Sequence, residues 1–430
     1  MLKTEKIKRT LKQTKKRRKN QVCKVYQLKL QNLSTADIEI LDRMFLEAKW
    51  LYNYIVADVS NRLNSKAWKL KEVEIKTPGG FESRKIEVLS SQIRQGIVER
   101  IKNNLKALKK LKEQGYKVGK LDFKSEISSI PLKQYGNTYK IDKNKNRVKI
   151  QGIKKKFRIL GLHQIPEEAE ISNAHLVKKP SGYYLHITCY VPKELNKPKQ
   201  AIHEAIGVDF GIKNQITLSN GIVIRWNVPE TKRLKKLQRS LARKKRGSKN
   251  YQKTKKKLQK EWEYITNIRK DIQNRIYALL RCYDIVAIQD ENIKGWHSGL
   301  FGKQVQSTGI GGIISRLKHS LETLILVDRY APTTKTCSRC GHIQEIGLNQ
   351  RVFRCENCGL EIDRDLNASL NILRIALEQK GLTDPLEMSV LPVGCGKVKP
   401  VEREVTARIL GNTPYIRVNF LCEAGSPLLQ

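Results

Sequence analysis

Four of the nine cysteines in the chain form two Cys-x-x-Cys pairs, which is the spacing of metal-binding knuckles. The first pair is Cys337 and Cys340, the second is Cys355 and Cys358, and a glycine follows each pair. Two residues between thiolates allow one tight turn to direct both sulfurs at a tetrahedral ion, and glycine gives that turn its backbone freedom. The spacing therefore predicts a structural Zn²⁺ site. Because four thiolates fill a tetrahedral ion, no position on it is left for catalysis.

A second set of candidate ligands consists of carboxylates at three places in the C-terminal half of the chain. Asp209 ends an apolar strand, Glu291 follows another apolar strand, and Asp363 and Asp365 stand at the predicted start of a helix. A carboxylate buried without a partner is costly, and a cation is the economical partner. Taken singly, each acid is explained at least as well as a strand-end or helix-capping residue. Taken together and in this order, the acids are a much more specific sign of a cation-binding site than any one of them alone.

The charge balance of 84 Lys and Arg against 41 Asp and Glu, a formal net charge of +43, implies a long polyanionic partner. Nucleic acid is the default candidate. The densest run covers residues 232–260, which hold fifteen basic residues and no acidic one, and we expect two helices joined near Gly247. Cations without counter-charge repel one another unless phosphates neutralise them, which favours a nucleic-acid contact over a merely solvated face. The predicted contact residues are Lys232, Arg233, Lys236, Arg243, Lys244, Lys245, Arg246, Lys255 and Lys256.

The other five cysteines indicate the cellular compartment. They are scattered and the total is odd, which argues for a reducing compartment rather than a disulfide framework. The sequence offers no run of about 18 apolar residues and no apolar signal segment. We therefore expect a soluble, cytoplasmic protein without a membrane partner.

The N-terminal half is predicted to contain a helical lobe and a set of strands. Ser34 and Asp37 resemble a capping box with Asp in place of Glu or Gln, and the apolar spacing beyond them predicts helices across residues 35–115. A strand at residues 22–30 and several short strands after residue 120 predict a β-barrel.

Both ends of the chain are expected to lack fixed structure. Residues 1–20 carry ten Lys and Arg, and we favour a disordered, solvated tail over an ordered nucleic-acid contact. The segment after about residue 380 has no hydrophobic period and is rich in turn and charged residues, so we expect it to be flexible.

The motifs that could carry chemistry also resemble those of one protein family. They are Asp209 in a Val-Asp-x-Gly strand, an acidic strand that ends in Glu-Asn-Ile-Lys-Gly, the double Cys-x-x-Cys, and Asp-Arg-Asp-x-Asn-Ala from Asp363 onward. In this combination they resemble the TnpB family of transposon-encoded, RNA-guided DNA nucleases, which are relatives of the type V CRISPR effectors. The resemblance spans about residues 22–375 and is most specific in the C-terminal half.

The resemblance implies an α+β multidomain fold, in which an RNase H-like (RuvC) α/β nuclease core carries an inserted four-cysteine zinc ribbon. An N-terminal β-barrel, the wedge, and a helical recognition lobe would precede this core. The expected divisions are a basic tail at 1–20, the wedge-like barrel at 21–34 and 120–198, the helical recognition lobe at 35–119, the RuvC-like core at 199–330, the zinc ribbon at 331–362, the third motif of the core at 363–380, and the flexible C-terminal tail at 381–430.

The resemblance also implies an activity and its partners. A guide RNA from the transposon end would pair with one strand of double-stranded target DNA, beside a short target-adjacent motif. Asp209 would be the first metal ligand and Asp365 the third, with Asp363 at the start of the helix. Two Mg²⁺ ions held by such acids would promote hydrolysis of a phosphodiester bond. We expect a monomer, associated with the nucleoid of a prokaryotic cell.

One position departs from the family pattern. Members commonly place their catalytic glutamate where this chain has Gln289, and an amide is a poorer Mg²⁺ ligand than a carboxylate. Glu291 lies two residues further along, and strand side chains return to the same face every second residue. We therefore expect Glu291 to serve as catalytic ligand with Asp209 and Asp365. The alternative is a nuclease-dead relative that acts as an RNA-guided repressor, and a transposase or transposase accessory protein is a third interpretation.

Overall fold

The computed structural model describes residues 3–382, apart from 78, 199, 227, 229 and 348, and residues 405–421, apart from 407, 412 and 413. The chain divides into two compact units, Met1–Lys197 and Pro198–Gln430. Helices and sheets occur in both units, so the mixed α and β character expected from the sequence is confirmed. Among the described residues, no helix combines the length and the apolar character that crossing a bilayer requires.

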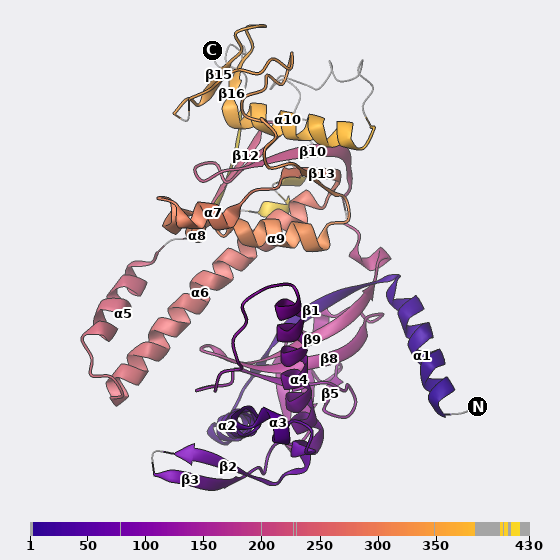
Figure 1. Cartoon of the computed structure of the whole chain (residues 1–430), viewed down its shortest axis with the longest axis vertical. Helices are drawn as coiled ribbons and strands as arrows, with labels where there is room; N and C mark the ends of the chain where they lie inside the picture. Colours follow the sequence, from indigo (N-terminus) through magenta and orange to yellow (C-terminus); the bar gives the residue numbers. More distant parts are fainter. Residues whose placement is uncertain are drawn as a thin grey trace. The chain divides into compact units, whose positions relative to one another are not determined.

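The first unit is built on a seven-stranded antiparallel sheet (Figure 1). In spatial order its strands are β4 (Ser129–Leu132), β8 (Glu170–Lys179), β9 (Gly182–Pro192), β1 (Gln21–Gln31), β7 (Lys156–Leu160), β6 (Arg147–Ile150) and β5 (Tyr139–Asp142). The order leaves β4 and β5 at opposite ends of the sheet. Closure into the expected wedge-like barrel therefore stays a prediction.

Two long helices, α2 (Thr35–Ala57) and α4 (Ser91–Glu113), and a β-hairpin of β2 (Glu72–Thr77) and β3 (Gly80–Lys85) complete this unit. The capping box at the start of α2 is confirmed, since the Ser34 hydroxyl accepts the Asp37 N–H and the Asp37 carboxylate accepts the Ser34 N–H. The apolar faces of both helices belong to the same hydrophobic core as the sheet. Periodicity in the sequence thus predicted both helices but not the hairpin between them, and their division into a separate recognition lobe stays a prediction.

The prediction of a disordered tail at residues 1–20 is wrong for most of that segment. Lys3–Arg18 forms helix α1. Its C-terminal end is attached to the sheet, because Arg17 and Arg18 both pair with Glu170, at 3.1 Å and 2.8 Å, and the Arg18 guanidinium lies over the ring of Tyr190. A carboxylate and an aromatic face from distant strands supply the counter-interactions that the local sequence lacks.

The second unit contains a six-stranded mixed sheet. In spatial order its strands are β14 (Leu324–Val327), β13 (Tyr283–Gln289), β10 (Ile202–Phe210), β11 (Ile216–Leu218), β12 (Ile222–Trp226) and β17 (Ile416–Phe420). Strands β14, β13 and β10 are parallel neighbours, whereas β10, β11, β12 and β17 pair antiparallel. The carboxyl ends of β10 and β13 therefore lie side by side, which is where an open α/β sheet builds its sites.

Helices cover both faces of this sheet (Figure 1). Ile206 and Val208 of β10 pack in one core with α6 (Lys249–Leu280) and α9 (Ile310–Ser320). Gly207 faces α10 (Arg364–Gln379) so closely that a Cβ there would stand 2.1 Å from the Ser369 carbonyl oxygen. Because side chains alternate along a strand, Asp209 projects to the α10 face.

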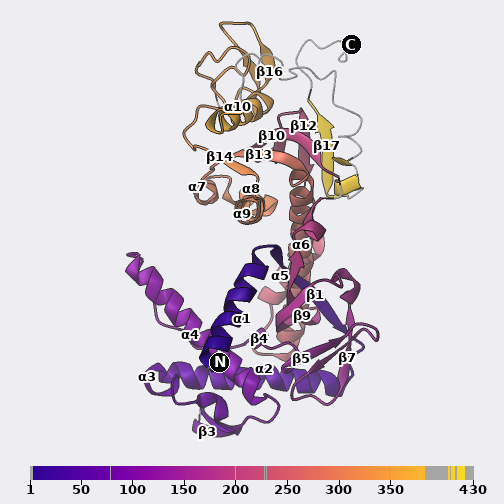
Figure 2. The same cartoon turned by 90° about the vertical axis from the view of Figure 1, so that its right-hand side faces the viewer.

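The prediction of a flexible tail at residues 381–430 is wrong for part of that segment. Strand β17 pairs with β12 along its whole length, as Figure 2 shows, and Val405 and Leu410 are buried in the core of this unit. The alternating Ile-Arg-Val-Asn-Phe pattern of β17 is too short to stand out without its partner strand. Residues 383–404 and 422–430 lie outside the described part of the chain.

Candidate functional site

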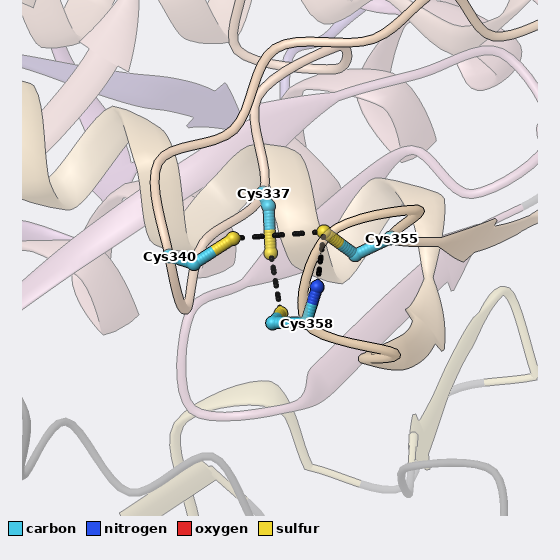
Figure 3. Close-up of side chains that lie close together, drawn as sticks. All are labelled: Cys337, Cys340, Cys355 and Cys358. Carbon is cyan, nitrogen blue, oxygen red and sulfur yellow. Dashed lines mark hydrogen bonds between the residues drawn. The ribbon is translucent and has the colours of Figure 1, made fainter.

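The four cysteine sulfurs converge on one point, as Figure 3 shows. All four Sγ atoms lie within 4.8 Å of one another, and the Cys337–Cys358 and Cys340–Cys355 separations are both 3.6 Å. Sulfurs at about 2.3 Å from a tetrahedral Zn²⁺ would be separated by about 3.8 Å. The donor set and its spacing therefore fit a structural zinc ion.

Two similar turns deliver these sulfurs. Gly341 and Gly359 adopt φ of 75° and 68°, in the left-handed region that favours glycine, and their N–H groups donate to the carbonyls of Cys337 and Cys355. Hydrogen bonding to the backbone N–H of His342 lowers the pKa of Cys340, whereas burial raises the pKa of the neighbouring Cys337. The glycines predicted from sequence thus have a direct structural reason.

Two buried asparagines of α10 hold the cysteine segment against the core. Asn367 donates to the Thr336 carbonyl and accepts the Ser338 N–H, at 2.7 Å and 2.9 Å. Asn371, one turn later, donates to the carbonyls of Thr333 and Thr336. Sequence analysis missed both, although two asparagines spaced by four on an otherwise apolar helix face were a visible signal.

The carboxylate site lies at the carboxyl ends of β10 and β13 and the start of α10. Burial, then the charge of Asp365, then that of Glu291 raise the pKa of Asp209 well above its usual range. Asp209 therefore lies within the electric field of both other predicted ligands. Among the described residues, however, the four cysteines are the one group of three or more such ligands that is gathered to the spacing of a single ion. Carboxylates that lie near one another repel, so bringing all three to one ion depends on that ion's own charge.

Asp363 and Asp365 have different roles at the start of α10. The Asp363 carboxylate caps the helix by accepting the N–H groups of Asp365 and Leu366, at 2.9 Å and 3.1 Å. This confirms the interpretation of Asp363 as a helix-start residue. The Asp365 carboxylate accepts a hydrogen bond of 3.0 Å from the side-chain amide of Asn214.

Gln289 is a structural residue. Its side-chain NH₂ donates to the carbonyls of Asp328, Arg329 and Ala331, at 3.0–3.1 Å, and its oxygen accepts the Thr333 hydroxyl. The side chain is 8% exposed. A glutamate could not donate to these three carbonyls, so the amide has a function at this position that the family's usual carboxylate could not perform.

Strand β13 ends at Gln289, so the prediction that Glu291 continues this strand and shares the face of Gln289 by alternation is wrong. The Asp290 N–H still donates to the Val327 carbonyl, but the Glu291 N–H donates back to the Gln289 carbonyl, so the chain turns. Strand alternation therefore does not fix the direction of Glu291. Its charge nevertheless acts on Asp209, and burial raises the pKa of Glu291 itself. Asp290 is directed elsewhere, to Lys318 and Arg329.

The predicted basic hairpin is formed by α5 (Lys232–Ala242) and α6. One side of α5 is hollowed to a volume of about 720 Å³, lined by Lys232, Lys235, Lys236, Arg239, Ser240, Arg243 and Lys244. Four of the predicted contact residues are among these lining residues. Arg233 instead pairs with Glu261 at 3.4 Å, and Lys245, Arg246, Lys255 and Lys256 lie outside the lining. The hollow offers a strip of cations suited to a phosphate backbone.

Comparison with known proteins finds matches on both parts of this site. A family model described as "Probable transposase" matches residues 186–296, and one described as "Cas12f1-like, TNB domain" matches residues 314–372. A Streptomyces pristinaespiralis protein named "Putative RNA-guided DNA endonuclease" is 26% identical over 338 residues, 68% of this chain and 83% of the relative. The "TnpB-like protein L79" of Acanthamoeba polyphaga mimivirus is 27% identical over 46% of this chain and 41% of its own length.

Among solved structures, a Cas12f1 chain in a complex with single guide RNA and target DNA matches with a TM-score of 0.44 and 15% sequence identity. The match covers 82% of the present chain and 99% of the Cas12f1 chain.

Proposed function

The chain belongs to the TnpB family, and from this premise we propose that it is an RNA-guided DNA endonuclease. The single observation that supports the proposal is the position of Asp209, at the end of β10 on the face covered by α10, where burial and then the charges of Asp365 and Glu291 raise its pKa. Like charges are costly to hold together, and such clusters mark sites that bind cations or perform chemistry. The three acids lie at or just beyond the carboxyl ends of β10 and β13 and at the start of α10.

The topology of the second unit supports an RNase H-like core. Three antiparallel strands, β10, β11 and β12, are followed in the chain by β13 and β14, which extend the sheet in parallel from β10. This arrangement agrees with the RuvC-like nuclease core that family membership implies. In this arrangement Asp209 lies on β10, and Asp365 lies on α10, the helix that packs against β10.

The donor set suits Mg²⁺, which prefers carboxylate oxygens. Asp209, Glu291 and Asp365 would hold the ions, and Asp363 caps the start of α10, the helix that carries Asp365. Bound Mg²⁺ supplies Lewis-acid chemistry that activates a water and stabilises the leaving oxygen. The four cysteines would hold a structural Zn²⁺, with no open coordination position.

The partners follow from family membership and charge. We propose a guide RNA from the transposon end and a double-stranded DNA target beside a short adjacent motif, both bound by a protein monomer in a nucleoid-containing cell. The cation-lined hollow on α5 is suited to a phosphate backbone. The domain divisions predicted above, including the wedge and the recognition lobe, belong to the same proposal.

The runner-up function is a nuclease-dead guided repressor, and Gln289 is the observation that favours it. If the chain has no ligand in place of the usual glutamate, the site holds two acids and binds metal poorly. Glu291 decides between the two functions.

A cleavage assay separates them. The chain is purified with its own RNA and given guide-matched DNA and Mg²⁺. We expect product from the wild type, a strong loss in Glu291→Ala, and retained cleavage in Gln289→Ala below its melting temperature. No product from the wild type, with tight guided binding retained, would contradict the nuclease and support the repressor.

A further inference from the structure

Asn214 connects two strands of the core to the proposed ligand Asp365. It lies in the turn between β10 and β11 and is 9% exposed. Its side-chain nitrogen donates to Oδ2 of Asp365 at 3.0 Å, and its side-chain oxygen accepts the Nε–H of Arg225, on β12, at 2.8 Å. One amide thus joins the antiparallel strands to the start of α10.

Arg225 determines which way this amide points. An asparagine side chain has one accepting end and one donating end of nearly the same shape, so its orientation is set by its partners. A guanidinium only donates, so the Asn214 oxygen must face Arg225. The NH₂ group is then directed at the carboxylate of Asp365.

The turn that carries Asn214 is held on two further sides. A Cβ at Gly211 would stand 2.5 Å from the Asn214 carbonyl oxygen, so glycine is required for this tight turn. The next residue, Gln215, is 6% exposed, donates to the Ile212 carbonyl and accepts the Trp226 N–H. The amide is therefore fixed by packing and hydrogen bonds before any ligand arrives.

A neutral donor suits a residue that holds a metal ligand in place. A hydrogen bond from an amide orients a carboxylate without cancelling its charge, whereas a nearby Lys or Arg would compete with the ion. Asn214 donates to Oδ2 of Asp365 at 3.0 Å, whereas Oδ1 forms a longer ion pair of 3.5 Å with the Arg364 guanidinium, so the shorter contact to this carboxylate is the neutral one.

We propose that Asn214 is a positioning residue that orients Asp365 for metal binding, and that Arg225 orients Asn214. This inference rests on the proposed function, because it requires Asp365 to be a metal ligand. Asn214 does not touch the ion or the substrate.

The test measures metal binding and cleavage separately on the purified complex of protein and RNA. Mn²⁺ replaces Mg²⁺, and its dissociation constant is obtained from the electron paramagnetic resonance signal of the free ion. Asn214→Ala is expected to weaken Mn²⁺ binding, and to raise the Mg²⁺ concentration for half-maximal cleavage, by about tenfold, the lower end for loss of a partner behind a metal ligand. Guide RNA binding is expected to be unchanged.

Asn220→Ala is the matched control. Asn220 lies in the neighbouring hairpin turn and bonds to the Tyr283 hydroxyl and the Ile222 N–H, away from Asp365. Its loss should lower stability and leave Mn²⁺ affinity unchanged. If Asn214→Ala does not fold, Arg225→Leu is used in its place. We expect Arg225→Leu to weaken Mn²⁺ binding severalfold and Arg225→Lys to recover part of the lost affinity.

The outcomes distinguish failure of the positioning inference from failure of the proposed metal site. If Asp365→Ala removes the bound Mn²⁺ while both Asn214→Ala and Arg225→Leu bind it as the wild type does, the positioning inference is overturned and the nuclease proposal stands. If Asp365→Ala itself binds Mn²⁺ and cleaves like the wild type, the proposed site is wrong and the inference falls with it.

Discussion

The cysteine cluster and the carboxylate site share helix α10 and differ in how closely their candidate ligands are gathered. Four sulfurs stand at the spacing of one metal ion, whereas the three carboxylates are close enough only to raise the pKa of Asp209. A thiol can stay neutral until metal displaces its proton, so four can approach one another. Carboxylates are ordinarily charged at neutral pH and repel. The comparison teaches that the spacing of the sulfurs alone identifies a candidate metal site, whereas the carboxylate site has to be identified from charge and from position in the sheet.

The two regions also depend on the same kind of support. Asn367 and Asn371 fix the cysteine segment to α10, and Asn214 fixes Asp365 at the start of that helix. In each case a buried amide makes hydrogen bonds that join groups from different segments of the unit. Damage to the zinc region should therefore reach the carboxylates through α10.

The largest expected effect comes from removing the zinc ligands. Cys355→Ser should lose the single zinc ion per chain and the fold of residues 331–362, because apparent Zn²⁺ binding energies of about 10–16 kcal/mol are folding energy in such modules. Elemental analysis measures the zinc, and limited proteolysis measures the fold. Cys23→Ser, at an exposed cysteine outside the cluster, is the control. Full zinc content in Cys355→Ser would show that the cluster is not the metal site.

The next effect is at the carboxylates. Asp209→Asn should reduce single-turnover cleavage by about 10³-fold, since the ions contribute several kcal/mol and each 1.36 kcal/mol is worth tenfold. In metal-free buffer the same variant should melt at a higher temperature, because it removes a charge held beside other acids. Cleavage at the wild-type rate would place the chemistry elsewhere.

A smaller effect tests Gln289. Gln289→Glu should lower the free energy of unfolding by about 3 kcal/mol, because a buried carboxylate would face three carbonyl oxygens. It should not increase cleavage. Chemical denaturation and the guided cleavage assay give the two readings. A more active Gln289→Glu enzyme would mean that position 289 is the ligand position and that Glu291 is not.

The pH dependence of the melting temperature offers a further test of the carboxylate site. A folded-state pKa raised above the unfolded value means that the folded chain binds more protons between the two. The contribution of Asp209 is thus most favourable below the usual aspartate pKa and declines as pH rises toward the raised folded value. Without added divalent ions, the gap between the melting temperatures of Asp209→Asn and the wild type should widen with pH, and Mg²⁺ should narrow it. A gap independent of pH and Mg²⁺ would contradict this.

The smallest effect lies outside both metal regions. Replacing Lys236, Arg243 and Lys244 with glutamine should weaken guide RNA binding severalfold and reduce its salt dependence by about 2 in the log–log slope, at about 0.7 per phosphate contact. Zinc content and Mn²⁺ affinity should not change. Binding assays across a salt series give the slope, and an unchanged slope would remove the hollow on α5 from the nucleic-acid interface.

Sequence reasoning found what local pattern encodes. The Cys-x-x-Cys spacing, the Ser34 capping box and the basic hairpin all depend on residues within one turn or helix of each other. It failed where contacts between residues far apart in the chain determine the local structure. Helix α1 is attached through Glu170, β17 forms on β12, and Gln289 has its partners some forty residues further along the chain.

The position of Glu291 shows the limit most clearly. Alternation along an assumed strand predicted the face of Glu291, but the backbone turns directly after Gln289. The Gln289 side chain is itself bonded to the loop that follows β14. The electrostatic effect on Asp209 survives this change of geometry. The electrostatic effect of Glu291 on Asp209 therefore supports the assignment where the local pattern does not.

The most direct test is diffraction from Mn²⁺-soaked crystals of the complex, recorded at the zinc and manganese absorption edges. We predict a zinc peak among the four cysteines and manganese peaks beside Asp209 and Asp365, with the Glu291 carboxylate turned to coordinate and Gln289 still bound to its loop. A zinc peak with no manganese at Asp209 and Asp365, or with Gln289 in place of Glu291 at the ion, would contradict the account.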